Sequence, residues 1–246
     1  MTGQTTNLTT DERSTLIIAL DVPTYDEASA VVRELGDAGH FYKIGLELLF
    51  DGGLRLAREL RDQGKLVFLD MKLLDIGNTV EKAVRNVAKL GLNYLTLHAT
   101  DRKTLRAARQ GKGDSDLKLL GVTVLTSLNA DDLAEQGIAA SPDELVLKRA
   151  KMAFDEGIDG VVAAGLEAQA IRQATNDAFH IVTPGIRPSG SAANDQARAA
   201  TPTDAILAGA SRLVVGRPIL AAADRRAAAL AILDEIRTAK STLKGE

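Results

Sequence analysis

Three charged residues follow directly on the apolar run Leu66–Leu69, namely Asp70, Lys72 and Asp75. Side chains two positions apart on a strand point to the same face, so the Asp70 carboxylate and the Lys72 ammonium would face one way and Met71 the other. An ammonium held beside a carboxylate can deliver a proton or stabilise developing negative charge. The alternatives are a surface salt bridge worth about 0–1 kcal/mol and, for Asp75, a helix N-cap.

Two more charged residues stand at the ends of other apolar runs. Asp21 follows Leu16–Leu20, and Lys43 lies within the end of Phe41–Ile44. Four or five charges at the ends of otherwise apolar segments are too concentrated for ordinary solvation. We therefore expect them to meet in one site.

A second signal is typical of phosphate binding. Two later runs end in the glycine-containing segments 183–188, which includes Pro184 and Arg187, and 215–218, which includes Gly216 and Arg217. Glycine lets backbone N–H groups approach phosphate oxygens, and arginine supplies a forked, permanently charged donor. The alternative is a pair of structural turns with exposed arginines.

The elements that would position these residues alternate along the chain. The strand-like runs, apolar on both faces as in a buried parallel sheet, are Leu16–Leu20, Phe41–Ile44, Leu66–Leu69, Tyr94–Leu97, Leu119–Leu125, Gly160–Ala163, His180–Val182 and Leu213–Val215. The helix-like stretches include Tyr25–Leu35, Leu46–Gln63, Asn78–Leu90, Pro142–Glu156, Thr201–Ala208 and Ala221 to about Thr238. Eight such alternations favour an α/β fold, the (β/α)8 TIM barrel, over an open doubly wound sheet. In such barrels the site lies at the carboxyl ends of the strands.

Composition and length set the remaining limits. We expect a single barrel domain from residue 15 to 246, preceded by a flexible tail at residues 1–14. The formal net charge of −3 argues against a general nucleic-acid binder. The chain has no cysteine, and neither a signal-peptide core nor a run of about 18 apolar residues occurs, so we expect a cytoplasmic protein without membrane association. The three histidines are too widely spaced to argue a metal site, and His98 fits a structural residue.

Seven segments, in order along the chain, resemble motifs of the orotidine 5'-phosphate decarboxylase family from about Leu16 to Leu233. The most specific is the segment 69–79, Leu-Asp-Met-Lys-Leu-Leu-Asp-Ile-Gly-Asn-Thr, which matches the family pattern Asp-x-Lys-x-x-Asp-Ile-x-x-Thr. The supporting segments are 19–21, 42–45, 122–127, 183–187, 195–198 and 214–219. The resemblance implies a cofactor-free and metal-free barrel enzyme of pyrimidine biosynthesis that makes uridine 5'-phosphate.

The resemblance also implies roles for individual residues. Lys72 would protonate C6 of the pyrimidine, while Asp70 would lie near the departing carboxylate and, with Lys43, hold Lys72 in an alternating charge network. Asp75 and Thr79 would cross a homodimer interface to complete the partner's site.

The implied substrate contacts extend along the pocket, from the ribose to the phosphate. Asp21 and Lys43 would bind the ribose hydroxyls, and Thr126 would read the pyrimidine edge. The phosphate would be held by Arg187, Gln196, Gly216 and Arg217, with the loop 184–194, beginning at Pro184, folding over it.

Three other functions remain open at this point. A magnesium-dependent sugar-phosphate decarboxylase or aldolase-like barrel would share the Asp-x-Lys-x-x-Asp spacing, but such enzymes tend to place a glutamate where Lys43 stands. A Schiff-base aldolase would use Lys43 or Lys72 as its nucleophile. A non-catalytic protein would bind uridine 5'-phosphate without releasing carbon dioxide.

Overall fold

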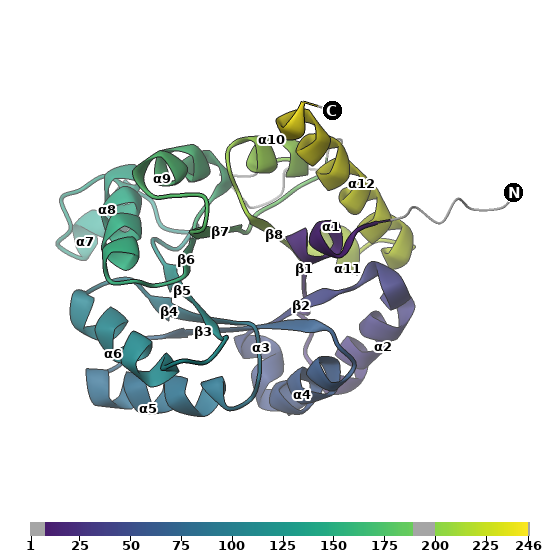
Figure 1. Cartoon of the computed structure of the whole chain (residues 1–246), viewed down its shortest axis with the longest axis horizontal. Coiled ribbons are helices and arrows are strands. Elements are labelled where there is room, and N and C mark those ends of the chain that lie inside the picture. The colour runs from purple at the N-terminus through teal and green to yellow at the C-terminus, as the bar shows by residue number, and fades with distance from the viewer. Residues whose placement is uncertain (1–7, 189–199, 246) are drawn as a thin grey trace, which may run out of the picture.

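The computed structural model describes residues 8–188 and 200–245. Its eight parallel strands pair in sequence order, and the first pairs with the last, which closes a barrel (Figure 1). The strands are β1 (Leu16–Ala19), β2 (Phe41–Ile44), β3 (Leu66–Leu73), β4 (Tyr94–His98), β5 (Lys118–Val122), β6 (Gly160–Val162), β7 (His180–Thr183) and β8 (Arg212–Val215). The predicted TIM barrel is confirmed.

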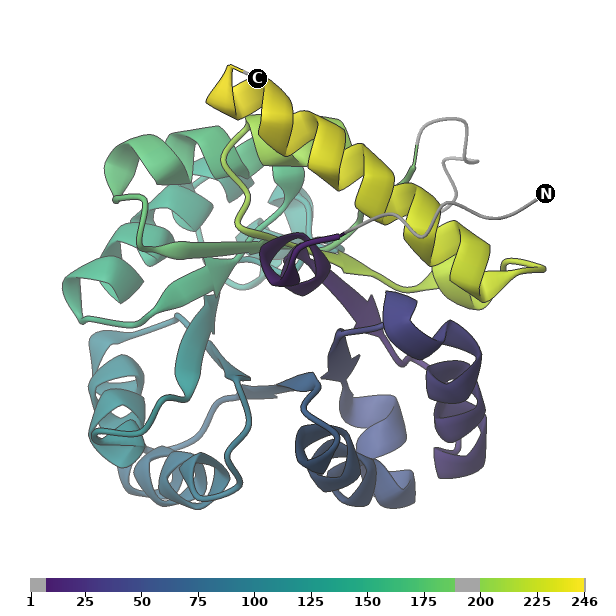
Figure 2. The same ribbon diagram turned by 45° about the vertical axis from the view of Figure 1, so that its right-hand side comes forward.

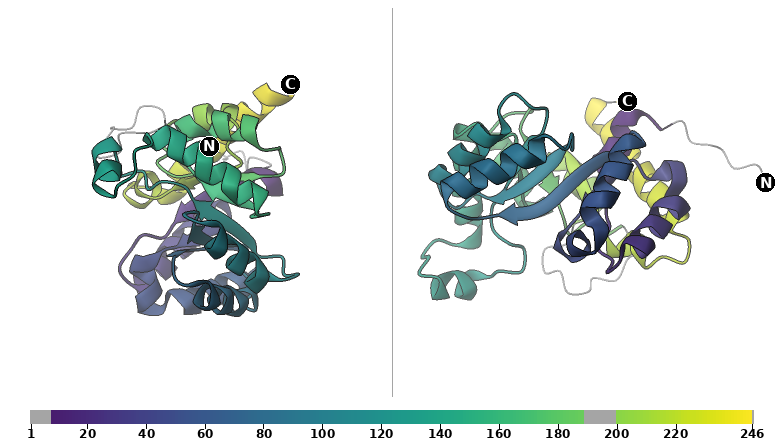
Figure 3. Two further views of the ribbon diagram at one scale, coloured as in Figure 1. Left: turned by 90° about the vertical axis from the view of Figure 1, so that its left-hand side faces the viewer. Right: turned by 90° about the horizontal axis from the view of Figure 1, so that it is seen from below.

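Helices connect successive strands and surround the barrel (Figures 1 and 2). They are α1 (Thr10–Thr15), α2 (Tyr25–Leu35), α3 (Leu46–Leu48), α4 (Leu54–Asp62), α5 (Gly77–Ala88), α6 (Arg102–Lys112), α7 (Ala130–Glu135), α8 (Pro142–Asp155), α9 (Ala168–Ala174), α10 (Pro202–Leu207), α11 (Arg217–Leu220) and α12 (Arg225–Lys244). Two 3-10 helices, η1 (Gly36–Ala38) and η3 (Gly165–Glu167), and a π-helical segment, η2 (Leu49–Gly53), complete the elements. The segment that carries α7 projects away from the barrel (Figure 3).

Strand alternation divides the core into two layers. One set of side chains packs between the sheet and the helices, and a smaller set fills the barrel interior, including Ile17, Phe41, Phe68 and Tyr94. Tyr94 packs edge to face against Phe41, with ring centroids 5.1 Å apart. Two positions after each of these inward-facing residues, the next inward side chain reaches the carboxyl end of the barrel.

Strand β3 is longer and less regular than predicted. Its pairing with β4 shifts from Leu69 opposite Leu95 to Leu73 opposite Leu97, so β3 carries a bulge. Within the bulge Lys72 adopts a positive φ of 47°, the only such non-glycine residue among those described. Simple alternation was therefore an incomplete reason for placing Lys72 on the same face as Asp70.

Several predicted boundaries were wrong. The helix expected over Leu46–Gln63 is interrupted within η2, where Gly52 has φ of 80°. Strand β5 stops at Val122 rather than Leu125, because its neighbour β6 ends at Val162 and offers no further ladder. The last helix begins at Arg225, where the Asp224 side chain accepts a hydrogen bond from the Ala227 N–H.

Part of the flexible tail expected over residues 1–14 is helical, because α1 begins at Thr10. Thr9 and Glu12 form a capping box that starts α1, and the Lys240 ammonium of α12 donates to Thr15 Oγ1 at 2.7 Å. Residues 1–7 lie outside the described part of the chain. Within residues 8–188 and 200–245, every helix is too short or too polar to cross a lipid bilayer.

Candidate active site

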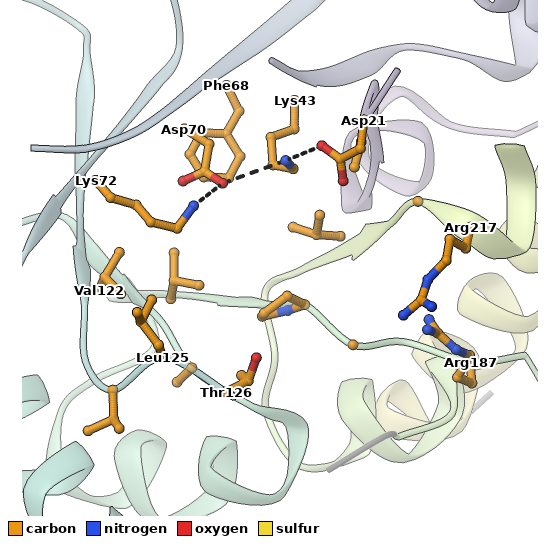
Figure 4. Close-up of a pocket in the computed structure, with 18 residues that line it drawn as sticks. Asp21, Lys43, Phe68, Asp70, Lys72, Val122, Leu125, Thr126, Arg187 and Arg217 are labelled. Carbon is orange, nitrogen blue, oxygen red and sulfur yellow. Dashed lines mark hydrogen bonds and ion pairs between the residues drawn. The ribbon is translucent and has the colours of Figure 1, made fainter. Parts of the chain in front are cut away.

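A cavity of about 330 Å³ opens at the carboxyl ends of the strands, a size that suits a small-molecule ligand (Figure 4). Every strand except β4 contributes to its lining, either directly or through the residues that follow it. The lining residues are Ala19, Asp21, Lys43, Phe68, Asp70, Lys72, Val122, Val124, Leu125, Thr126, Val162, Ala163, Pro184, Gly185, Arg187, Val214, Gly216 and Arg217.

Four charged side chains form an alternating chain along one wall. Lys43 Nζ lies 2.8 Å from Asp21 Oδ1 and 3.6 Å from Asp70 Oδ2, and Lys72 Nζ lies 2.7 Å from the same Asp70 oxygen (Figure 4). Gly45 leaves room for this arrangement, since a Cβ there would come within 3.1 Å of Lys43 Nζ. The sequence predicted that these residues would meet, and the structure brings them together.

Of the two carboxylates in this row of four charges, Asp70 is the more enclosed, with its side chain 11% exposed against 50% for Asp21. Burial by itself would raise the pKa of Asp70, but the charges of Lys43 and Lys72, with hydrogen bonds from Lys72 and Thr96, lower it overall. Asp70 is therefore ionised at neutral pH. A fixed negative charge and two ammonium groups are thus in place before any ligand binds.

Thr96 is the contact that the sequence reasoning missed. It is fully buried on β4, and its hydroxyl contacts both Asp70 and the backbone of Lys72. Attention went to charged residues at or beyond the strand ends, whereas Thr96 is an uncharged residue two positions after the inward-facing Tyr94. Alternation along the run Tyr94–Leu97 places the Thr96 side chain on the same inward face as Tyr94, and this pattern was visible in the sequence.

Two arginines mark the opposite side of the cavity. Arg187, after β7, and Arg217, after β8, point toward one another across the space (Figure 4). Gly185, which also lines the cavity, has φ of 77°, a conformation that favours glycine, and it allows the turn after β7. This pair of guanidinium groups suits an anion with several oxygens.

Apolar residues of the lining lie across the cavity from the charged side chains. They include Val122, Val124 and Leu125, and Thr126 lies on the same side as Val122 and Leu125 (Figure 4). Such a surface suits a flat ring that presents one polar edge. The predicted placement of Thr126 in the site is consistent with this geometry.

Some predicted site residues do not join this cavity. Asp75 and Thr79 are exposed and do not line it; Asp75 accepts a hydrogen bond from the Ile76 N–H at 2.6 Å. Helix α5 begins at Gly77 with Ile76 at the N-cap position, so Asp75 does not cap it. Gln196 lies outside the described residues, as does most of the loop 184–194.

His98 lies at the end of β4 without lining the cavity. Burial, followed by the charges of Arg149 and Lys72, lowers its pKa, so the imidazole is neutral at pH 7. In the described part of the chain, no three histidine or acidic side chains gather as a metal site would require.

A barrel whose cavity joins an ammonium–carboxylate chain to an arginine pair belongs to the enzymes that act on phosphorylated small molecules. The Orotidine 5'-phosphate decarboxylase / HUMPS family matches residues 14–232, and the chain belongs to this family. The activity that family membership and structural similarity support is decarboxylation of orotidine 5'-phosphate, a reaction of pyrimidine biosynthesis.

Two solved structures are similar over most of the chain. Orotidine 5'-phosphate decarboxylase from Lactobacillus acidophilus is 38% identical, with a TM-score of 0.80, over 90% of this chain and 98% of that one. An uncharacterized conserved protein from Geobacillus kaustophilus is 31% identical, with a TM-score of 0.77, over 90% and 99% of the respective chains.

Proposed function

We propose that Lys72 is the proton donor for the conversion of orotidine 5'-phosphate to uridine 5'-phosphate and carbon dioxide. The bond from C6 to the carboxylate breaks, its electron pair stays on C6, and the Lys72 ammonium transfers a proton to that carbon. Neutral Lys72 then regains a proton from solvent. The observation that carries this proposal is the Lys72 ammonium 2.7 Å from Asp70 Oδ2, in the wall of the cavity.

The chemistry needs a cation because the C6 carbanion has no adjacent carbonyl that could delocalise its charge. Lys72, held by Asp70, supplies that cation without reorganisation during the reaction. Asp70 acts in a second way. Two carboxylates about 4 Å apart repel by roughly 4 kcal/mol at an effective dielectric constant near 20, so the bound substrate gains little before carbon dioxide leaves.

The remaining cavity residues fit the rest of the nucleotide. Asp21 and Lys43 bind the ribose hydroxyls, and the half-exposed Asp21 carboxylate keeps acceptor capacity beside its bond to Lys43. Thr126 reads the pyrimidine edge from the apolar side of the cavity. The distance between the charged chain and the arginines is spanned by the sugar.

The phosphate binds at the other side. Arg187 and Arg217 supply charged donors, Gly216 allows close approach of the backbone, and Gln196 adds an amide.

Asp75 and Thr79 complete the site of a second subunit in a homodimer. Both are exposed and lie outside their own chain's cavity. Their neighbours Leu74 and Ile76 are 57% and 72% exposed, an apolar surface that association would cover. This arrangement explains why the most specific motif of the chain extends beyond the residues of one cavity.

No metal or organic cofactor takes part in this mechanism. Lys43 places an ammonium between two carboxylates, where a magnesium enzyme of similar spacing would use an acidic ligand. The proposed chemistry uses only the charges of the protein.

The direct test is orotidine 5'-phosphate with purified, chelator-treated protein, followed by ultraviolet absorbance and carbon dioxide release. Equal turnover with and without chelator supports the proposal. Loss of turnover that magnesium restores would instead assign the chain to metal-dependent sugar-phosphate chemistry. Borohydride inactivation with a carbonyl substrate would indicate a Schiff base, and nucleotide binding without carbon dioxide release would indicate a binding protein.

A further inference from the structure

The hydroxyl of Thr96 joins the two residues of the reacting pair. Thr96 is fully buried on β4, beside the bulge of β3. Its Oγ1 donates to Asp70 Oδ1 at 2.8 Å and accepts from the backbone N–H of Lys72 at 2.9 Å. One small side chain therefore contacts the carboxylate of one residue and the backbone of the other.

The bulge explains why a side chain is needed at this position. Between the Leu69 and Leu73 pairings, three residues of β3 face a single residue of β4, so the backbone ladder is interrupted. Lys72 lies in this gap with φ of 47°, which L residues rarely adopt. The Thr96 hydroxyl accepts from the Lys72 N–H in place of a backbone carbonyl.

The same hydroxyl fixes the rotation of the Asp70 carboxylate. Oδ1 is held by Thr96, and this leaves Oδ2 facing Lys72 Nζ at 2.7 Å and Lys43 Nζ at 3.6 Å. A rotation of the carboxylate would break the bond to Thr96 and move Oδ2 away from both ammonium groups. Thr96 therefore sets which oxygen holds the proposed proton donor.

We propose that Thr96 is a positioning residue, whose hydroxyl fixes the Lys72 backbone and the Asp70 carboxylate in the geometry that decarboxylation requires. This inference rests on the proposed function, because it takes Asp70 and Lys72 as the reacting pair. Thr96 does not line the cavity, so its hydroxyl acts through Asp70 and Lys72 rather than on the substrate.

The Thr96 hydroxyl has a single proton, and its use favours the ionised form of the Asp70 carboxylate. Because Thr96 accepts from the Lys72 N–H, its own proton is directed to Asp70, and the ionised carboxylate is the better acceptor. The charged or titratable groups around Asp70 are Lys43 on β2, Lys72 on β3 and His98 on β4, with Asp21 beyond Lys43. Loss of the hydroxyl removes one of the contacts that keep Asp70 ionised.

The first test is Thr96→Val, which keeps the shape and removes the hydroxyl. We expect kcat to fall about 10- to 100-fold, while the affinity for uridine 5'-phosphate changes less than threefold. Two further readouts do not depend on turnover. The pKa of Asp70, followed by carboxyl NMR, rises, and the Lys72 amide exchanges at least tenfold faster with solvent.

Thr15→Val is the matched control. Thr15 is also fully buried, and its hydroxyl also donates one bond, to the Asp11 carbonyl, and accepts one, from Lys240. It precedes β1, at the other end of the barrel. The control loses stability, but its kcat, the pKa of its Asp70 and the exchange of its Lys72 amide match those of the wild type.

Thr96→Ser restores the hydroxyl and keeps kcat within about threefold of the wild type. If Thr96→Val does not fold, Thr96→Ala replaces it in the same comparison with Thr96→Ser. A folded hydroxyl-free variant with wild-type kcat, Asp70 pKa and Lys72 exchange overturns the inference about Thr96. Full turnover in Lys72→Ala overturns the proposed function instead, whatever the Thr96 variants do.

Discussion

The two ends of the barrel carry similar residues in different settings. At the base, where the strands begin, Asp159 accepts from Lys112 at 2.8 Å through both carboxylate oxygens and from the Leu119 backbone N–H at 2.9 Å. At the mouth, where the strands end, Asp70 and Lys72 pair as closely but line a cavity. The residue types of a lysine–aspartate pair therefore do not by themselves indicate a catalytic site. What distinguishes the pair at the mouth is the cavity beside it.

The histidines repeat the contrast. At the base, the His180 ring packs beside Tyr94, and its Nδ1 lies 3.2 Å from the Tyr94 hydroxyl. At the mouth, His98 lies next to the charged chain without contacting the cavity. His180 is thus paired within the base, whereas the mouth places charged side chains along a cavity.

Removal of the two lysines gives the largest expected contrast. Lys72→Ala should lower kcat about 10⁴- to 10⁶-fold with the fold intact, because proton delivery and charge stabilisation are lost together. Lys112→Met should leave kcat within twofold and lower the free energy of unfolding by about 1–3 kcal/mol, since Asp159 loses a charged donor. Steady-state kinetics and urea unfolding measure both; normal turnover in Lys72→Ala would remove Lys72 from the mechanism.

Mixed subunits test whether the mouth is completed by a partner chain. In a heterodimer of Lys72→Ala and Asp75→Asn subunits, one site combines both substitutions and the other is intact. Random 1:1 mixing places half of the subunits in heterodimers, so activity should recover from near zero to about one quarter of the wild type. Heterodimers confirmed by differential tagging that stay inactive would argue against sharing Asp75.

Both ends of β8 carry an arginine, and this allows a smaller comparison. Arg217→Ala at the mouth should weaken uridine 5'-phosphate binding about 10- to 100-fold, as loss of a charged hydrogen bond predicts, and change uridine binding less than twofold. Arg212→Met at the base should change neither affinity. Calorimetry measures all four; equal losses for nucleotide and nucleoside would contradict a phosphate role for Arg217.

The sequence was sufficient for the barrel and for most of the mouth, because both depend on local pattern. The positions of Asp21, Lys43 and Asp70 at strand ends, with alternation along each strand, predicted correctly that they lie together. Alternation could not predict the bulge that contains Lys72, because the bulge depends on how β3 pairs with the neighbouring strand β4. Thr96 could be placed inside the barrel by alternation, but its contacts with Asp70 and the Lys72 backbone could not be predicted, because they depend on that pairing.

Predicted helix boundaries were wrong where helix-breaking residues interrupt a segment of helical periodicity. The pattern over Leu46–Gln63 is helical throughout, yet Asp51 and Gly52 leave helical geometry and divide the segment. The helix at Thr10–Thr15 was overlooked although Thr9 and Glu12 have the spacing of a capping box. Its other partner, Lys240 in α12, is more than two hundred residues away.

His180 at the base gives the smallest expected effect. Burial, and then the nearby Arg212 charge, lower its pKa from 6.5 to about 4 in the folded protein. Between these two values the unfolded chain binds a proton and the folded one does not, so wild-type stability falls as pH decreases from 6.5 toward 4. His180→Gln removes this titration and keeps a side chain that can pair with Tyr94.

The stability of His180→Gln relative to the wild type should therefore increase as the pH falls. We expect the difference in Tm between His180→Gln and the wild type to shift by a few degrees in favour of the variant from pH 7 to pH 4.5. Calorimetry at both values measures it, and groups common to the two proteins cancel in the difference. A Tm difference independent of pH would show that His180 titrates normally, and the base would then be more open to water than its packing indicates.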